Sequence, residues 1–311
     1  MPRPLAVSLF SGAGGFDEGI ELAGFEIALA LEIDRHARTT YRANFPAVPV
    51  VPGDIYNFLG SRATRHRELY GLGSVDLIFG GPPCAGFSTI GRRDPLDERN
   101  ELYRQYVRVV AELRPRMFVM ENVPNILLLS EGEFRDDILL GFRQAGYANV
   151  VHIRISATDF GVPQHRDRIF FLGTRDDLGL ASDLRPFADA FLSTLKVASA
   201  TTVREAIGDL PADVVPSGRT LPYPKAQIHP SDFLRRMRLD LGHGPFTLEA
   251  KQRRAASNEP RALHNHHTKE IGCRRAELIS HLAPGDKGDS LPAHLWRGVR
   301  SGKWRRPPCQ R

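Results

Sequence analysis

The chain has 311 residues, enough to bury a large core and to form one large domain with a smaller one beside it. Its formal net charge of +6 and isoelectric point near 9.4 favour an anionic partner, with nucleic acid first. Three widely spaced cysteines fit neither a disulfide framework nor a zinc site, which favours a reducing cytoplasm. No apolar run reaches membrane-spanning length, so we expect no membrane span and no signal peptide.

The first half of the chain alternates predicted strands with predicted helices. Strands are predicted at 5–10, 25–33, 48–51, 75–79, 117–120 and 169–173, and helices at 16–23, 35–44, 102–113 and 134–145. Repeated strand–helix units predict an α/β fold with a doubly wound, mostly parallel sheet. The alternation of predicted strands and helices ends at about residue 176. We therefore expect a sheet domain over 1–176 and a smaller, irregular and basic region over 177–311.

A glycine turn follows the first predicted strand. Gly12, Gly14 and Gly15 let the backbone approach a ligand closely, and the helix that begins at Phe16 points its N-terminus at the same place. The spacing differs from the Gly-x-Gly-x-x-Gly pattern of dinucleotide sites. The turn therefore predicts a ligand site without a pyrophosphate.

Two acidic residues end the next two predicted strands. Glu32, about twenty residues after the glycine turn, suits the two hydroxyls of a ribose. Asp54 is suited to accept a hydrogen bond from an adenine amino group. The alternative for each residue is a solvated loop acid. Because three such features follow three successive strands, we expect an adenosine compound as the ligand.

A cysteine, a carboxylate and two arginines lie next to three further strands. Cys84 follows a buried strand within a segment too rich in Gly and Pro to be helix or strand; the alternative is a small buried cysteine in a turn. Glu121 follows the strand at 117–120. Arg166 and Arg168 precede the strand at 169, one residue apart, so in extended chain they point the same way. Such a set suits attack on an electron-poor ring.

These segments together resemble a known family. The chain resembles the bacterial-type DNA (cytosine-5)-methyltransferases through five motifs in the order that the family has them. They are Phe10-Ser11-Gly12-Ala13-Gly14-Gly15-Phe16, Gly53-Asp54-Ile55, Gly80 to Ser88, Glu121-Asn122-Val123 and Gln164-x-Arg166-x-Arg168. Thr202 to Leu210 resembles a segment that many members carry later in the chain.

The resemblance implies a mechanism for the reacting residues. Cys84 would add as a thiolate to C6 of cytosine, which makes C5 nucleophilic, and would leave once C5 is methylated and deprotonated. Nearby arginine or phosphate contacts would help to form the thiolate. Glu121 would hydrogen-bond the N3 edge of the ring, for which it must be protonated or share a proton. Arg166 and Arg168 would hold the base carbonyl, the phosphate or the Cys84 loop.

The resemblance also implies the methyl donor, S-adenosylmethionine, and no metal. The adenosine would lie near the glycine turn of Gly12, Gly14, Gly15 and Phe16, and against Phe10, Glu32, Ile33, Asp54 and Ile55, with Pro82 near the reacting end. The cluster at 264–267 holds three histidines, but no cysteine or acid is spaced to complete a metal site.

Duplex DNA is the implied partner, and the cell's cytoplasmic nucleoid the implied location. Because C6 is covered in a stacked duplex, the target base must swing out into the site. The loop at 85–100 contains Gly86 and Gly91 and several arginines, which suits closure on DNA; the alternative is a solvated basic loop. Residues 177–311 would form the target-recognition region, whose basic clusters suit phosphate contacts.

The end of the sequence departs from the family. Its closing Gln-x-Phe-Pro and Gly-Asn-Ala-Val-Pro-like segments are not found before Arg311. We therefore expect a C-terminally incomplete or split enzyme, active alone or completed by a second polypeptide. The alternative is a catalytically silent fragment that binds DNA. An RNA methyltransferase is a lesser rival, because the long recognition region favours duplex DNA.

Overall fold

The computed structural model describes residues 2–58, 74–83, 101–179 and 183–208, and the short stretches 221–222, 231, 233–234 and 262–263. By their internal contacts the residues form two compact units. The first comprises Met1–Gly208 and Pro230–Gln252, and the second Asp209–His229 and Arg253–Arg311. The division into a catalytic part and a recognition part at residue 176 stays a prediction.

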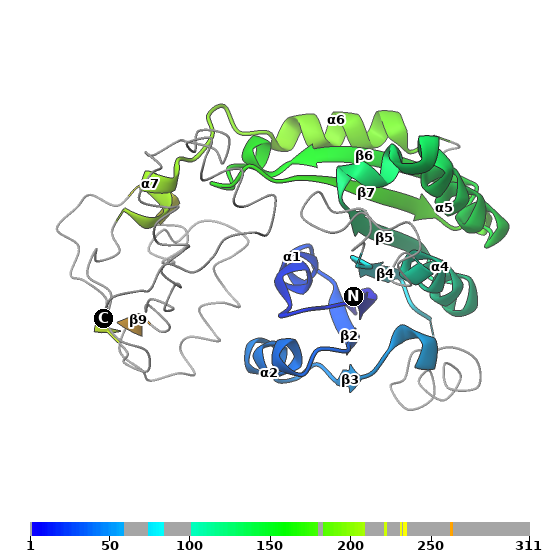
Figure 1. The fold of residues 1–311 in the computed structure, drawn as a ribbon, viewed down its shortest axis with the longest axis horizontal. Coiled ribbons are helices and arrows are strands. Elements are labelled where there is room, and N and C mark those ends of the chain that lie inside the picture. Colours follow the sequence, from blue (N-terminus) through cyan, green and yellow to red (C-terminus); the bar gives the residue numbers. More distant parts are fainter. Residues whose placement is uncertain are drawn as a thin grey trace, which may run out of the picture. The chain divides into compact units, whose positions relative to one another are not determined.

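The first unit is built on a seven-stranded sheet with the strand order β3-β2-β1-β4-β5-β7-β6 (Figure 1). Its strands are β1 (Leu5–Leu9), β2 (Glu26–Glu32), β3 (Val50–Pro52), β4 (Leu77–Gly80), β5 (Met117–Asn122), β6 (Asn149–Ser156) and β7 (Asp167–Thr174). The helices of this unit are α1 (Gly15–Leu22), α2 (Arg35–Asn44), α4 (Leu102–Leu113), α5 (Glu133–Gln144), α6 (Arg185–Leu195) and α7 (Val203–Ile207). Strands β1 to β5 pair in parallel, which confirms the predicted doubly wound, mostly parallel α/β fold.

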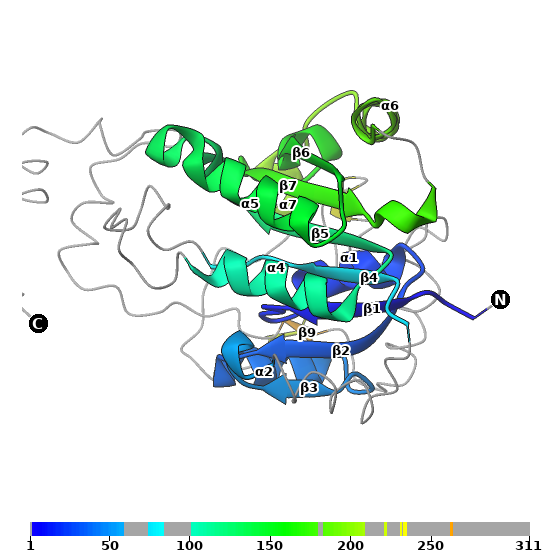
Figure 2. The same ribbon diagram turned by 90° about the vertical axis from the view of Figure 1, so that its right-hand side faces the viewer.

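Helices cover both faces of this sheet, so its central strands are buried on both sides. Every residue of β4 is buried. On one face lie α4 and α5 (Figure 2). They pack over the largest apolar cluster of the described residues, in which Tyr106, Phe118 and Phe142 are fully buried. On the other face α1 packs Phe16 and Ile20 over a smaller cluster around Phe79, and α2 buries Tyr41 and Phe45. Figure 1 shows α1 and α2 on the side of the sheet opposite α4 and α5.

The predicted elements differ from the observed ones mainly at their ends. Helices α2 and α4 have the predicted bounds. Phe10, predicted to end the first strand, lies just beyond β1 because its φ of 57° turns the chain out of the sheet. Glu121 was predicted to follow a strand and Arg168 to precede one. They instead lie inside β5 and β7, because the antiparallel pairing of these two strands extends both of them.

Several observed elements have no counterpart among the predicted ones, and β6 and α6 are the longest of them. Strand β6 alternates buried Val151 and Ile153 with polar residues. It therefore contains no continuous apolar run from which a buried strand would be predicted. It pairs antiparallel with β7 at the edge of the sheet. Helix α6, beyond residue 176, buries no residue and is tied to β6 by a hydrogen bond from Arg185 Nη2 to the backbone oxygen of His152 (2.5 Å).

In the second unit the described residues form one short antiparallel pair, β8 (Leu221–Pro222) with β9 (Ala262–Leu263). Among the described residues of the chain, no helix has both the length and the apolar character needed to cross a membrane. The same residues contain no group of three or more His, Cys, Asp or Glu side chains arranged to hold a metal ion. The histidine cluster at 264–267 lies outside the described residues.

Candidate active site

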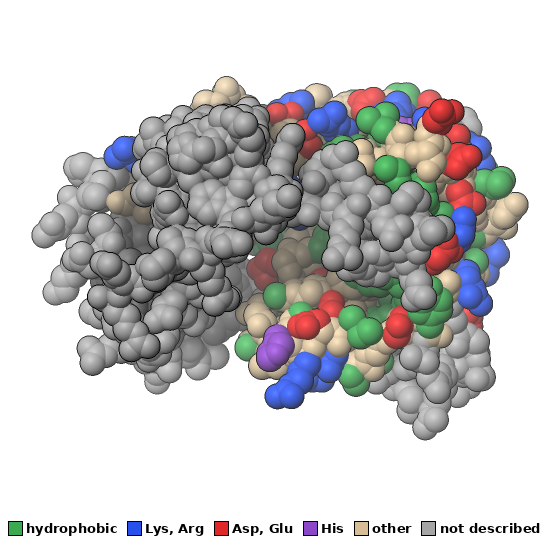
Figure 3. All heavy atoms as spheres, viewed as in Figure 1, with side chains coloured by type: hydrophobic (Ala, Val, Ile, Leu, Met, Phe, Trp, Pro, Cys, Tyr) green, Lys and Arg blue, Asp and Glu red, His purple; other side chains and the backbone are tan. Residues whose placement is uncertain are grey.

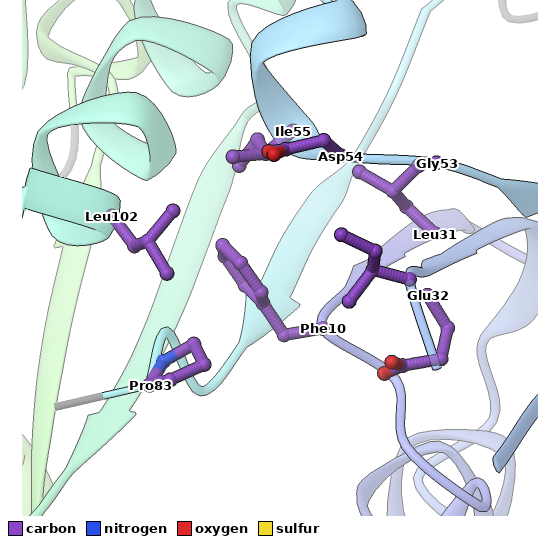
Figure 4. A pocket seen from close by; sticks show the side chains of 9 residues that line it. Phe10, Leu31, Glu32, Gly53, Asp54, Ile55, Pro83 and Leu102 are labelled. Atoms are coloured by element: carbon purple, nitrogen blue, oxygen red, sulfur yellow. The ribbon is translucent and has the colours of Figure 1, made fainter. Parts of the chain in front are cut away.

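A cavity of about 280 Å³ opens at the carboxyl edge of the parallel strands. Its lining comes from the ends of β1, β2 and β4, from the segment after β3, and from the start of α4. The lining residues are Phe10, Leu31, Glu32, Ile33, Gly53, Asp54, Ile55, Pro83 and Leu102. Figure 4 shows Phe10 between Pro83 and Leu102 on one side and Leu31 and Glu32 on the other. The lining is largely apolar, with two carboxylates at the side of β2 and β3.

The carboxylate of Glu32 is fixed by backbone donors on both sides. Its Oε2 accepts a hydrogen bond from the backbone N–H of Gly12 (2.8 Å), and its Oε1 accepts one from that of Asp34 (2.7 Å). A carboxylate oxygen has two acceptor positions, so each oxygen can accept a further hydrogen bond from a ligand hydroxyl. Glu32 is therefore held in one orientation while keeping acceptor capacity toward the cavity.

The glycine turn lies beside the cavity rather than in its wall. Gly12 has a φ of 57° and contributes its N–H to Glu32, whereas Gly15 begins α1. Gly14 packs its Cα against α2: a Cβ there would lie 2.2 Å from the Phe45 ring. Phe16 lies in the cluster on the α1 face, with its ring 5.1 Å from that of Phe79. The structure thus puts these four predicted site residues behind the cavity lining.

Asp54 lies at the opposite end of the cavity from Pro83 (Figure 4). Its Oδ1 accepts a hydrogen bond from the backbone N–H of Tyr56 (3.2 Å), which caps the short turn Ile55–Asn57. Ile55 is buried beneath it, and Ile33 is 64% exposed at the cavity rim. Phe10, Glu32, Ile33, Asp54 and Ile55, all predicted to bind the cofactor, therefore line one cavity.

A second group of polar residues lies at the ends of β4, β5 and β7. Glu121 Oε1 lies 2.6 Å from Arg168 Nε, and each side chain is about one quarter exposed. Glu121 Oε2 lies against Gly81, where a Cβ would approach it to 2.7 Å. The absence of a side chain at Gly81 therefore leaves the space that the carboxylate occupies.

Asn122 joins β5 to the segment that leads to Cys84. It is buried, and its Nδ2 donates to the backbone oxygen of Pro82 (3.3 Å). Pro82 is itself buried and does not line the cavity, whereas its neighbour Pro83 does. Cys84 and the loop at 85–100 lie outside the described residues. Arg166 is exposed, and the described contacts do not bring it to the pair of Glu121 and Arg168.

The model that describes the C-5 cytosine-specific DNA methylases matches residues 6–234 of this chain. The chain belongs to this family.

Several curated members are similar to it. Type II methyltransferase M.XorII of Xanthomonas oryzae pv. oryzae is 37% identical over 214 residues, which are 68% of this chain and 47% of that protein. M.AgeI of Thalassovita gelatinovora is 32% identical over 308 residues, 94% of this chain and 66% of that protein. M.AquIA of Picosynechococcus sp. is 38% identical over 233 residues, 69% of this chain and 92% of that protein. The chain thus spans about half the length of M.XorII.

A solved structure agrees with this membership. The crystal structure of a protein assigned as a DNA modification methyltransferase, encoded within a prophage of E. coli, superposes with a TM-score of 0.67 at 26% identity. The match covers 90% of this chain and 76% of that one. The sheet is therefore that of the methyltransferases of the Rossmann-like class, as predicted.

Sequence reasoning missed four residues of the cavity lining. Leu31, Gly53 and Pro83 are each the chain neighbour of a predicted site residue, so their motifs contained the signal. Leu102 had no such signal, because it reaches the cavity from α4, whose start is fixed elsewhere. Tyr103 Oη donates to Asp137 Oδ2 (2.5 Å) on α5, and this contact between helices holds the first turn of α4.

Proposed function

We propose that this protein transfers the methyl group of S-adenosylmethionine to C5 of a flipped-out cytosine in duplex DNA through a covalent bond between Cys84 and C6. The observation that carries the proposal is the pair of Glu121 and Arg168 next to Gly81, three residues before Cys84. This pair lies at the same sheet edge as a cavity suited to an adenosine. Membership of the C-5 cytosine family supports the reaction class.

The residues of the cavity fit the methyl donor. Phe10, Ile55 and Leu102 offer apolar surface to an adenine ring, and Glu32 offers two fixed carboxylate oxygens to a ribose. Asp54 is the second acceptor in the lining and suits the adenine amino group. The bound donor supplies an electrophilic methyl group on a sulfonium centre. On this proposal the glycine turn holds Glu32 through Gly12 and does not itself contact the adenine.

The remaining residues act on the cytosine. Cys84, as a thiolate, adds to C6, and the electron pair displaced toward C5 takes the methyl group. A base then removes the C5 proton, and the Cys84 sulfur leaves with the electrons of its bond. Glu121 contacts the ring at N3, where negative charge builds during the attack, and Arg168 fixes the Glu121 carboxylate. A proton on Glu121 during that contact stays a prediction.

Charge supports duplex DNA as the substrate. Residues 177–311 carry 22 Lys and Arg against 14 Asp and Glu, whereas residues 1–176 carry 20 against 22. On the face of the molecule in Figure 3, the described acidic and basic side chains are interspersed. We therefore assign most phosphate contacts to the later part of the chain, which acts as the target-recognition region. The names of the Type II relatives support a place in a restriction-modification system.

A trapping experiment tests this function. Duplex DNA that contains 5-fluorocytosine should form a stable covalent adduct with the protein when S-adenosylmethionine is present, because fluorine cannot leave as a cation. Cys84→Ser should bind the same DNA and form no adduct, since an alkoxide forms far less readily than a thiolate. Methyl transfer to C5 of ordinary DNA without any adduct on the fluorinated DNA would contradict the covalent step.

A DNA-binding polypeptide that is catalytically silent on its own is the second candidate. Two comparisons support this candidate: the chain spans about half the length of M.XorII, whereas its match covers 92% of M.AquIA. Methyl transfer by the 311-residue protein alone, counted as turnovers per protein molecule, separates the two candidates. More than one turnover contradicts the silent alternative. DNA binding without turnover, restored by a second polypeptide bearing the family's closing segments, supports a split enzyme.

A further inference from the structure

Helix α2 contacts both the segment that follows Glu32 and the glycine turn. The helix begins at Arg35, and its N-cap is Asp34, two residues after Glu32 in the chain; the Asp34 side chain accepts from Ala37 N (2.7 Å). Its C-terminal turn packs against the glycine turn, where Asn44 Nδ2 donates to the backbone oxygen of Ala13 (3.1 Å). The same helix thus touches the ribose side and the back of the glycine turn.

One buried hydrogen bond joins this helix to α1. Tyr41 Oη donates to Asp17 Oδ1 (2.6 Å), and neither side chain is exposed. Asp17 lies in the first turn of α1, directly after the glycine turn. The ring of Tyr41 also lies 3.2 Å from the position that a Cβ on Gly14 would take. Tyr41 therefore contacts the glycine turn from behind and holds the helix that leaves it.

These contacts form a closed ring that connects the glycine turn, Glu32, α2 and α1. It runs from Gly12 through the hydrogen bond to Glu32, along the chain to Asp34, and along α2 to Tyr41. From Tyr41 it returns through Asp17 and α1 to the glycine turn. The hydrogen bond between Tyr41 and Asp17 therefore belongs to the same connected set of contacts as the hydrogen bond between Gly12 and Glu32.

We propose, on the basis of the function proposed above, that Asp17 and Tyr41 are positioning residues of the cofactor site, which hold the glycine turn in place for Glu32 to receive the ribose. Neither residue lines the cavity, so neither touches the cofactor. A hydrogen bond to a buried carboxyl group contributes more than an average one. Its loss should therefore loosen the turn measurably without unfolding the sheet.

The test compares two buried tyrosines. Tyr41→Phe removes the hydrogen bond to Asp17, and Tyr147→Phe is the matched control. Tyr147 is also fully buried and donates one short hydrogen bond, to the backbone oxygen of Pro115 (2.7 Å), far from the cavity lining. Both variants should lose similar thermal stability. Hydrogen–deuterium exchange of the peptide at residues 10–16, measured without cofactor, should be about tenfold faster only in Tyr41→Phe.

Calorimetry with S-adenosylmethionine gives the second readout. Tyr41→Phe should weaken binding about tenfold, and Tyr147→Phe should change it less than twofold. Asp17→Asn keeps an acceptor for Tyr41, so it should stay within about threefold of the unmodified protein. If Tyr41→Phe does not fold, Asn44→Ala, whose side chain is exposed, should still speed exchange of the same peptide severalfold.

Two outcomes separate the possible failures. Equal exchange of residues 10–16 in Tyr41→Phe, Asn44→Ala and Tyr147→Phe would overturn the positioning role. Absence of cofactor binding by the unmodified protein, together with faster exchange in Tyr41→Phe, would overturn the proposed function while leaving the role of the two residues in the turn supported.

Discussion

Gly81 shows how one missing side chain can serve the site. Its Cα faces the Glu121 carboxylate, and a Cβ there would lie 2.7 Å from Glu121 Oε2, closer than van der Waals contact allows. The carboxylate would have to move, and its contact of 2.6 Å with Arg168 would change with it. A glycine is therefore needed at this position because any larger side chain would occupy the space of the Glu121 carboxylate.

Gly81→Ala should lower the rate of methyl transfer about a hundredfold, which is the usual contribution of a positioned acid or base. Binding of S-adenosylmethionine should change little, because Gly81 does not line the cavity. Single-turnover kinetics and calorimetry on the same preparation measure the two effects. Gly19→Ala on α1, where no atom lies within 4 Å of the new Cβ, is the control and should retain the full rate. A normal rate in Gly81→Ala would contradict this account of Glu121.

Asp17 makes the stability of the protein depend on pH. Burial raises the pKa of its carboxyl group to about 6, against the opposing effect of the hydrogen bond from Tyr41, while Glu21 raises it further. A folded-state pKa above the unfolded one means that the protonated group favours folding. That contribution is complete below pH 4 and is lost as the pH rises through about 6.

Asp17→Asn removes this titration and keeps an acceptor for Tyr41. The variant and the unmodified protein should have similar free energies of unfolding at pH 4. At pH 7.5 the variant should be more stable by up to about 3 kcal/mol, since a shift of about two pKa units corresponds to that free energy. Urea unfolding at both pH values measures the difference. A difference that stays constant between pH 4 and pH 7.5 would show that Asp17 does not titrate in this range.

At the scale of the elements, aromatic packing fixes α5 and α4 to the sheet. Phe142 on α5 stacks on Phe118 of β5 with ring centroids 3.7 Å apart, and both are fully buried. Tyr106 on α4 meets the Phe142 ring edge-on at 6.3 Å and donates to backbone oxygens of β4 and β5. Strands β4 and β5, the second of which contains Glu121, are therefore held from this face.

Phe142→Ala should lower the free energy of unfolding by about 3–5 kcal/mol, because it leaves a cavity between α5 and β5. Leu140→Ala on the same helix is the control: its side chain is 51% exposed, and the change should stay within about 0.5 kcal/mol. Chemical denaturation of the two variants gives both values. Similar losses in the two variants would mean that α5 does not pack on the sheet as described.

At the scale of the whole molecule, the charge distribution predicts how DNA binding responds to salt. The excess of Lys and Arg lies in residues 177–311, with clusters at 235–238 and 251–254. Each phosphate contact should contribute about 0.9 to the slope of log affinity against log salt concentration. Steep salt dependence is thus expected for the full chain.

Replacing Arg253 and Arg254 by Ala should reduce that slope by about one to two. Arg104→Ala is the control, because Arg104 is already paired with Glu101 and Asp137 on the first unit. Fluorescence anisotropy with one duplex at several salt concentrations measures all three proteins. An unchanged slope in the double variant, or an equal loss in Arg104→Ala, would contradict the assignment of phosphate contacts to the later residues.

The amino-acid sequence was enough to predict most of the strand–helix order, a mostly parallel sheet and five of the residues that line the cavity. These features are local: buried strands are apolar runs, turns need glycine, and parallel strands place their ends at one edge. Phe10, Glu32 and Asp54 could be found because each ends a strand or follows one within two residues.

Which side chains become partners followed from the packing of the folded chain. The pairing of Glu121 with Arg168 depends on β7 running antiparallel beside β5. Strand β6 was not predicted because polar residues alternate with its buried apolar ones. Leu102 in the cavity and the bond between Asp17 and Tyr41 join segments that no motif connects. Such contacts arise from packing between elements distant in the chain, and packing depends on how whole helices lie against the sheet rather than on the residues beside them.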